Sequence, residues 1–359
     1  MMDFDPKTSR RSILKAGAIF AGAMAAPAVL RRPAEAQDKV LYVNTWGGGW
    51  TAAEDEAYFK PFTQETGVQI KTVSPVSFAK LKSQVQSGNY EWDCSTFNSA
   101  ELIQADKEGL VEHIDWSVVD RNALYPKGGI FKDLAVVTAV LSCNLGYRRD
   151  KFPNGGPKNW ADFWDVKKFP QKRAMWDRSY TSIAFALLAD GVPVDKLYPL
   201  DLNRAFKKLD EIKPHIKVWY TQGGQIDQLV RDAEVDMLPV WGSRAPQLIQ
   251  SGVPLEMVWE GAEDVATNWC VAKGSPRAKL AWQFIATCAK PERLAKFCEK
   301  LNYAYGPIDP RALDFIKPEF RQQMPTTPEH AKVSFFHDAD WLAEQLPTLR
   351  DRWSQWLAS

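Results

Sequence analysis

The sequence has no surplus of charge of either sign, because 45 Lys and Arg residues are balanced by 44 Asp and Glu residues. Binding to nucleic acid or to an anionic membrane usually requires a basic excess, so we expect neither as a partner. Histidine is scarce, with four residues, and their spacing does not match a zinc site. We therefore expect no metal site and no cofactor.

Cysteine is also scarce, with five residues and no CxxC pair. The odd number allows at most two disulfides, and the sequence does not choose their pairing. An exported protein can form such bridges. Five buried free thiols are the alternative, and the sequence leaves both open.

Motifs of common enzyme classes are missing as well. The segment Trp46-Gly-Gly-Gly-Trp50 has neither the GxGxxG spacing nor the Lys-Ser/Thr pair of a phosphate-binding loop. The sequence has no GxSxG motif, and no histidine stands beside a plausible nucleophile. These absences favour a binding protein over an enzyme. An exported enzyme and a binding protein that serves a sensor remain as alternatives.

The first 36 residues predict an export signal. Arg10-Arg11 precedes an apolar run over residues 16–30, and Ala34-Glu35-Ala36 provides small residues for cleavage. The paired arginines are typical of the twin-arginine (Tat) type, so we expect the Tat export machinery as a partner and a periplasmic mature protein that begins near Gln37. A membrane anchor is the alternative, but the run is shorter than the ~20 residues of a span.

After this segment, short β-rich runs alternate with helical segments, which predicts an α/β fold with a largely parallel sheet. The run over 136–147 is long for one strand and is expected to cross between two lobes. A helix is expected over 51–66, with Thr51 as its cap, and another over 338–357, interrupted at Pro347. The other expected strands cover 39–45, 68–73, 92–96, 173–176, 216–220, 235–240, 255–259 and 268–272, and the other expected helices cover 78–87, 99–108, 160–165, 180–189, 202–213, 226–231, 245–251, 279–289 and 291–300.

Tryptophan is abundant, with 15 residues. Indole rings offer flat, electron-rich faces that stack on other groups or hold cations. The surplus therefore suggests aromatic surfaces that contact a ligand.

Several segments between about residues 41 and 312 occur in a familiar order. The sequence resembles the spermidine/putrescine-binding proteins of bacterial ABC importers, which are class II periplasmic binding proteins. The segments that carry the resemblance are Leu41-Tyr-Val-Asn-Thr-Trp46, Phe62-Thr-Gln-Glu-Thr-Gly67, Tyr90-Glu-Trp-Asp93, Glu108-Gly-Leu-Val-Glu-His-Ile-Asp115, Lys158-Asn-Trp-Ala-Asp-Phe-Trp164, Asp236-Met-Leu-Pro-Val-Trp241 and Gly252-Val-Pro-Leu-Glu256.

The resemblance implies a two-lobe periplasmic-binding-protein fold of type II, in which each lobe has a mostly parallel sheet flanked by helices. It places one lobe at about residues 37–138 plus 265–308. The other lobe covers about 139–264, with residues 309–359 and the C-terminal helices packed against it. Crossover strands join the lobes, and a small-molecule solute lies between them. The resemblance implies delivery to ABC permease subunits by a monomer, with no chemical reaction.

The resemblance also implies candidate ligand-binding residues. Trp46 and Trp241 match aromatic positions of the family, and Trp50 stands near another. Arg178 and Asn268 occupy places where the family has acidic residues. The other candidates are Asn98, Asp177, Arg244, Tyr303 and Tyr305.

The arginine at position 178 changes the expected ligand. A guanidinium repels an ammonium group at the same place but matches a carboxylate with its planar fork of donors. The tryptophans can still face an amine. We therefore expect a small zwitterion or an amino-acid-like carboxylate, and a polyamine such as putrescine or spermidine is the alternative.

Overall fold

The structure is a computed structural model that describes residues 40–359. The predicted export signal, residues 1–36, lies outside the described residues. Within the described part, no helix combines the length and the apolar character needed to cross a membrane.

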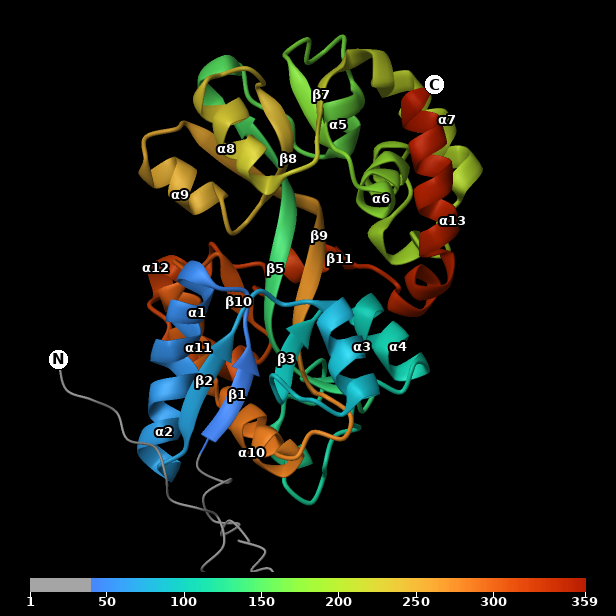
Figure 1. Cartoon of the computed structure of the whole chain (residues 1–359). Coiled ribbons are helices and arrows are strands. Elements are labelled where there is room, and N and C mark those ends of the chain that lie inside the picture. The colour runs from blue at the N-terminus through green and yellow to red at the C-terminus, as the bar shows by residue number, and fades with distance from the viewer. Residues whose placement is uncertain (1–39) are drawn as a thin grey trace, which may run out of the picture. The chain divides into compact units, whose positions relative to one another are not determined.

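One mixed sheet of eleven strands organises the described residues (Figure 1). Its main path runs in the order β2-β1-β3-β9-β5-β8-β6-β7. The strands of this path are β1 (Val40–Asn44), β2 (Gln69–Val73), β3 (Cys94–Phe97), β5 (Ala135–Arg148), β6 (Arg173–Trp176), β7 (Ile216–Tyr220), β8 (Met237–Trp241) and β9 (Leu255–Val271). Three short strands lie beside it: β4 (Ile130–Phe131) and β10 (Tyr305–Pro307) pair with β5, and β11 (Phe335–Phe336) pairs with β9.

The sheet consists of two parallel half-sheets joined by two long antiparallel strands. In the first half-sheet, β1 pairs in parallel with β2 and β3; in the second, β6 pairs in parallel with β7 and β8. Strands β5 and β9 pair antiparallel with each other, and they extend through both half-sheets (Figure 1). This arrangement confirms the α/β class and the crossing role of the run over 136–147.

The second crossing strand was not predicted from the sequence. Residues 255–259 and 268–272 were expected to form two strands, but β9 continues through Gly261 and the acidic residues that follow it. Gly261 has φ +72°, and a Cβ there would lie 2.8 Å from the Trp160 ring. The Gly261 carbonyl accepts a 2.8 Å hydrogen bond from Trp160 Nε1. The Trp160 indole therefore packs against β9 and stabilises it at Gly261, where the sequence of the strand disfavours β structure.

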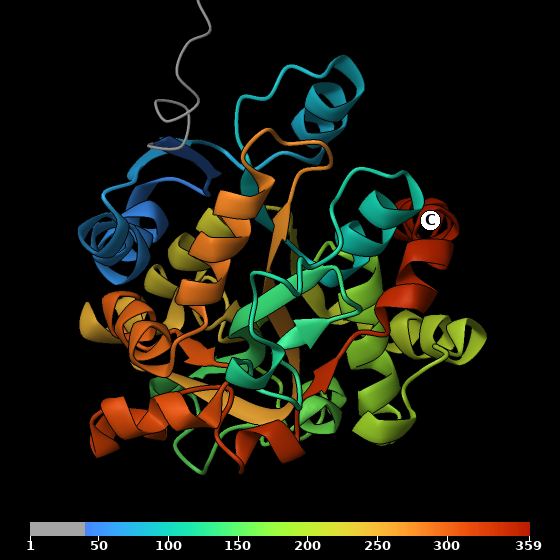
Figure 2. The same ribbon diagram turned by 90° about the horizontal axis from the view of Figure 1, so that it is seen from below.

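Helices flank both half-sheets, and most expected helices agree with the structure within about three residues, close to the usual uncertainty of element ends. Figure 2 shows α13 beside α4, across the molecule from α1 and α2. The helices are α1 (Gly48–Glu54), α2 (Lys60–Thr66), α3 (Phe78–Ser87), α4 (Ser99–Lys107), α5 (Trp160–Trp164), α6 (Ser179–Ala189), α7 (Leu202–Ile212), α8 (Gly223–Arg231), α9 (Ala245–Gln250), α10 (Ala278–Cys288), α11 (Pro291–Lys300), α12 (Pro318–Arg321) and α13 (Ala339–Ala358).

The first helix begins earlier than expected. Its cap is Gly47 with φ +88°, so the expected cap at Thr51 is wrong. The hydroxyl of Thr51 instead accepts a 3.1 Å hydrogen bond from the Gly47 N–H. A glycine tolerates this positive φ, which lets the helix start inside the glycine run. A π-helical stretch, Asp55–Phe59, then separates α1 from α2.

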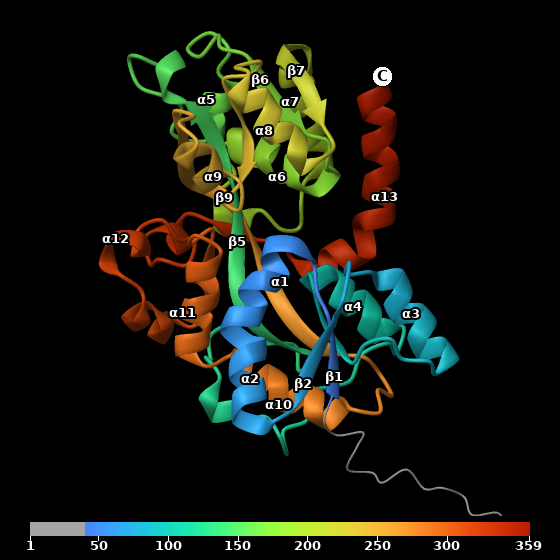
Figure 3. The ribbon, with the colours of Figure 1, turned by 60° about the vertical axis from the view of Figure 1, so that its left-hand side comes forward.

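Helix α13 runs through Pro347 without the expected interruption. A proline removes one backbone hydrogen bond from a helix, but contacts on both sides of Pro347 hold this helix. Before the proline, Asp340 pairs with Lys132; after it, Trp353 Nε1 donates to Asp177 Oδ1 at 2.7 Å. Helix α13 packs against α4 and also against α6; Figure 3 shows its first turns beside α4. It therefore contacts helices from both half-sheets.

The hydrophobic core contains many of the tryptophans and all the cysteines. The side chains of Trp92, Trp160, Trp269 and Trp282 are fully buried. Each of the five cysteines is a buried free thiol, so the structure holds the second of the two alternatives that the sequence left open.

Glu54 gives a stability prediction because its carboxyl group is fully buried in α1, where Thr45 Oγ1 donates to it. Burial raises the pKa of Glu54 from 4.5 to about 8, although the Thr45 hydrogen bond opposes the shift. The folded state therefore keeps a proton that the unfolded state loses, and stability falls as pH rises from about 5 towards 8. The slope expected from this one group is about 1.4 kcal/mol per pH unit.

We predict that Glu54→Gln removes this loss, because an uncharged amide resembles the protonated acid. Urea unfolding at several pH values measures the difference between the variant and the wild-type protein. The exposed Glu260→Gln variant is the control. A variant whose stability follows the wild-type pH profile would contradict the assignment.

Candidate functional site

A cavity of about 1000 Å³ lies beside the crossing strand β9, where the two half-sheets meet α13. Asn98 follows the end of β3, and Arg178 follows the end of β6. The carboxyl ends of parallel strands are the usual place for ligand sites in α/β proteins. Most lining residues belong to the start of α4, the segment over 127–132 that includes β4, Arg178 and Tyr180, strand β9, and α13 as far as Arg350. The cavity therefore combines residues from both half-sheets.

Arg178 is the main cation on the side of the second half-sheet. Its guanidinium lies 4.3 Å from the ring centre of Tyr180, 4.5 Å from that of Trp176 and 5.9 Å from that of Trp241. Burial lowers the pKa of Arg178, while the charge of Glu263 opposes that shift. Among residues 40–359, no carboxylate lies within 4.0 Å of this guanidinium. Arg178 is thus a partly buried cation whose donors are available to an anion.

The start of α6 adds to this positive region. Arg178 is the N-cap residue of α6, and its side chain makes no capping hydrogen bond. The first N–H groups of a helix have no partner within the helix, and they carry its positive dipole end. The N–H groups of Ser179 and Tyr180 are therefore further donors beside the guanidinium.

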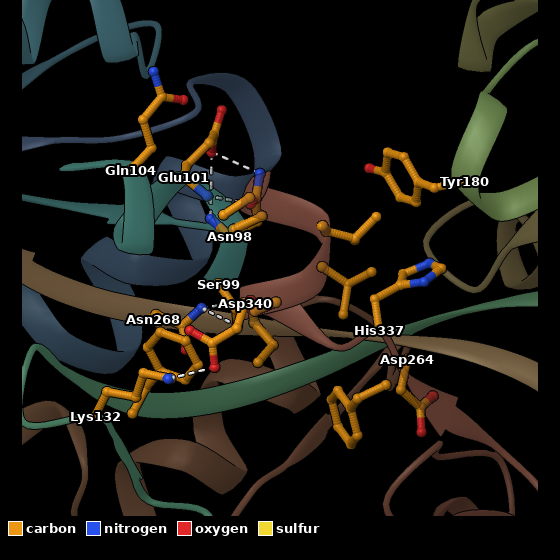
Figure 4. Close-up of a pocket in the computed structure, with 18 of the residues that line it drawn as sticks. Asn98, Ser99, Glu101, Gln104, Lys132, Tyr180, Asp264, Asn268, His337 and Asp340 are labelled. Carbon is orange, nitrogen blue, oxygen red and sulfur yellow. Dashed lines mark hydrogen bonds and ion pairs between the residues drawn. The ribbon is translucent and has the colours of Figure 1, made fainter. Parts of the chain in front are cut away.

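The opposite wall carries acceptors. At the start of α4, Asn98 and Glu101 form a capping box, in which Asn98 Oδ1 accepts from the Glu101 N–H at 2.9 Å. Burial raises the pKa of Glu101, although its hydrogen bonds with Asn98 and the charges of Arg178 and Arg350 oppose the shift. Figure 4 shows Glu101 and Asn98 on one side of the cavity and Tyr180 on the other. The two walls therefore differ in charge.

A largely buried contact between a carboxylate and an imidazole lies where β9 meets the C-terminal segment. Nε2 of His337 lies 2.8 Å from Oε1 of Glu263, and both side chains are largely buried. Burial pushes the pKa of Glu263 upward, but His337 and Arg178 together hold it below its ordinary value. The ring of His337 also contacts the Tyr198 hydroxyl. This pair anchors the C-terminal segment to β9 at the edge of the cavity.

The structure brings three of the predicted site residues into the cavity wall: Asn98, Arg178 and Asn268. Asn268 is fully buried and donates from Nδ2 to the Phe97 carbonyl at 2.9 Å. Its Oδ1 has no partner among the described residues. An amide held in this way presents a fixed acceptor beside the cavity.

Three other candidates lie near this wall without lining it. Trp46 follows β1 and is 51% exposed, with its Nε1 donating to Thr96 Oγ1 at 3.1 Å. Trp241 meets the Trp176 ring edge-on at 5.1 Å, so it supports the aromatic surface around Arg178. Asp177 accepts from Trp353, as described above. Their contact with a ligand remains a prediction.

The remaining four candidates are engaged elsewhere. Trp50 meets Tyr305 edge-on at 5.1 Å, and both partly buried rings pack against the core that includes Phe297 of α11. Tyr303 stacks on Phe320 at 4.3 Å, and Arg244 pairs with Asp227 at 2.9 Å. These four side chains do not line the cavity.

Several lining residues were not found by sequence reasoning. Glu101 lies in the first turn of an expected helix, where an acidic residue is common, so nothing in the sequence indicated that it also lines a cavity. Glu263 lies in the part of β9 that was not expected to be a strand. His337 comes from a segment far along the chain, and only the pairing of β11 with β9 brings it to the site.

Comparisons with a family model and with known proteins point to the same family. Residues 57–326 match the family model described as bacterial extracellular solute-binding protein. The chain is 33% identical to the gamma-aminobutyric acid-binding protein of Pseudomonas aeruginosa, over 90% of this chain and 93% of that protein. It is 22% identical to the spermidine/putrescine-binding periplasmic protein of Salmonella typhimurium, over 90% of this chain and 91% of that one.

A solved structure agrees with these relatives. An ABC transporter substrate-binding protein from Bradyrhizobium japonicum superposes with a TM-score of 0.82 at 33% identity, over 88% of this chain and 99% of that one. The proteins of this family bind solutes and are not enzymes. The chain belongs to the bacterial extracellular solute-binding protein family.

Proposed function

We propose that this protein captures a small amine-bearing carboxylate in the periplasm and delivers it to the permease of an ABC importer. The observation that carries the ligand class is the partly buried Arg178, which has no carboxylate within 4.0 Å among the described residues. In this proposal the Tat machinery exports the chain, cleavage occurs near Ala36 and Gln37, and the mature protein acts as a monomer. The solute-binding family and the ABC transporter relative support the transport role.

The charge and geometry around Arg178 support a carboxylate rather than an ammonium group. A carboxylate can accept paired hydrogen bonds from the guanidinium fork and further bonds from the N–H groups at the start of α6. An ammonium group at the same place would meet a like charge in a region shielded from water. The gamma-aminobutyric acid bound by the Pseudomonas aeruginosa relative, as its name states, is an amine-bearing carboxylate.

Lobe closure is the proposed way in which the solute is held. The proposed lobes are residues 37–138 plus 265–308 and residues 139–264, with residues 309–359 packed against the second. Strands β5 and β9 are continuous between the half-sheets, so they are the natural hinge for a rigid-body rotation. Closure would move the exposed Trp46 towards Trp241 and Arg178.

The first prediction concerns charge selectivity and uses two solutes that differ mainly at one end. Calorimetry should show binding of 4-aminobutyrate and much weaker binding of 1,4-diaminobutane, because the second ammonium group would replace the carboxylate at Arg178. Stronger binding of the diamine would contradict the proposed ligand class and favour the polyamine alternative.

The second prediction concerns Arg178 itself. Arg178→Ala should weaken binding of 4-aminobutyrate by about 2–4 kcal/mol, because the carboxylate would lose a charged partner that closure of the lobes shields from water. This is roughly a 30- to 1000-fold increase in Kd. Arg231→Ala, which removes an exposed arginine from α8, is the matched control and should bind as the wild-type protein does. Equal affinities of all three proteins would place Arg178 outside the ligand contacts.

The third prediction concerns closure. Small-angle scattering should give a smaller radius of gyration with saturating 4-aminobutyrate than without it, because the lobes rotate together about β5 and β9. Identical curves from a protein that demonstrably binds the solute would contradict the hinge.

A further inference from the structure

The two helices that begin at the cavity differ in how their N-termini are satisfied. Helix α6 starts at Arg178 without a side-chain cap, so its wall is positive. Helix α4 starts with a complete capping box, and the carboxylate of Glu101 offsets its dipole. The cavity therefore has a positive wall on the second half-sheet and a wall with a negative group on the first.

Glu101 uses only part of its hydrogen-bonding capacity within the protein. Its Oε2 accepts from Asn98 Nδ2 at 2.6 Å. Its Oε1 has no hydrogen-bond partner, and no cationic side chain lies within 4.0 Å of the carboxylate, among the described residues. Arg178 and Arg350 also line the cavity, and their charges act on Glu101 without forming an ion pair with it. A carboxylate that is partly shielded from water and incompletely hydrogen-bonded is stabilised when a cation binds to it.

Each of the other carboxylates of the cavity wall differs from Glu101 in its surroundings. Oε1 of Glu263 already lies 2.8 Å from Nε2 of His337, although neither oxygen of this carboxylate has a hydrogen-bond partner among the described residues. Asp340 pairs with Lys132. Asp264 accepts from Ser334 Oγ at 2.5 Å and its Oδ1 has no partner among the described residues, but burial raises its pKa to about 7, which favours its uncharged form. Glu101 is thus the lining carboxylate that is best placed to take a new cationic partner.

We propose that Glu101 receives the ammonium group of the solute while Arg178 binds its carboxylate, so that the cavity recognises both ends of a zwitterion. This inference rests on the proposed function and adds a specificity-determining residue to it. A solute without the amine would leave Glu101 unpaired in a closed site, which is a penalty against that solute. Glu101 therefore separates amine-bearing carboxylates from simple carboxylates.

Glu101→Gln is the variant that tests this role, because glutamine also completes a capping box and the substitution removes only the charge. We expect it to raise the Kd of 4-aminobutyrate by about 10- to 100-fold, the scale of a lost hydrogen bond to a charged group. The Kd of 4-hydroxybutanoate, which replaces the amine with a neutral hydroxyl, should stay the same or decrease. Competition against 4-aminobutyrate measures the weaker solute in each protein.

Glu108→Gln is the matched control, because it removes an exposed carboxylate immediately after the same helix and outside the cavity wall. It should bind both solutes as the wild-type protein does. Unchanged binding of 4-aminobutyrate by Glu101→Gln would overturn the inference and leave the proposed function intact. An equal loss for both solutes would also overturn it, since that result indicates a structural role. Failure of the wild-type protein to bind any amine-bearing carboxylate would instead contradict the proposed function, and this inference with it.

Discussion

A partly buried guanidinium without a bound carboxylate is the feature on which the binding properties of this site depend. Arg178 has lost much of its water to three aromatic rings, and the charge of Glu263 compensates only from a distance. Such a group is costly unless an anion completes it. In a solute-binding protein, this cost can contribute to ligand recognition. An anionic solute that pairs with the guanidinium removes the cost, and its affinity increases accordingly.

The fold produces this arrangement by placing two strand ends opposite each other. Strands β3 and β6 belong to different half-sheets, and each is followed directly by a helix that starts at the cavity. Continuous β5 and β9 join the half-sheets, while α13 contacts helices from both. Charge on one wall is therefore positioned independently of charge on the other. A rotation about the long strands can bring the two walls onto one solute.

The sequence predicted the parts of this protein that depend on local pattern. Strand and helix positions followed hydrophobic alternation and caps, and Arg178 was recognised because its charge departs from the family's acidic residue. The continuity of β9 could not be predicted, because it depends on Trp160 packing over Gly261 from far away in the chain. Trp50 and Tyr305 were candidate ligand contacts, and in the structure their rings contact each other and pack against the core. Local pattern identifies an aromatic residue without telling which neighbours surround it.

A crystal structure of the protein with 4-aminobutyrate tests the central claim most directly. The account predicts electron density for the solute between the two walls, with its carboxylate within hydrogen-bond distance of the Arg178 guanidinium. Density in which Arg178 instead forms a direct ion pair with Glu263, and the solute carboxylate lies elsewhere, would contradict it.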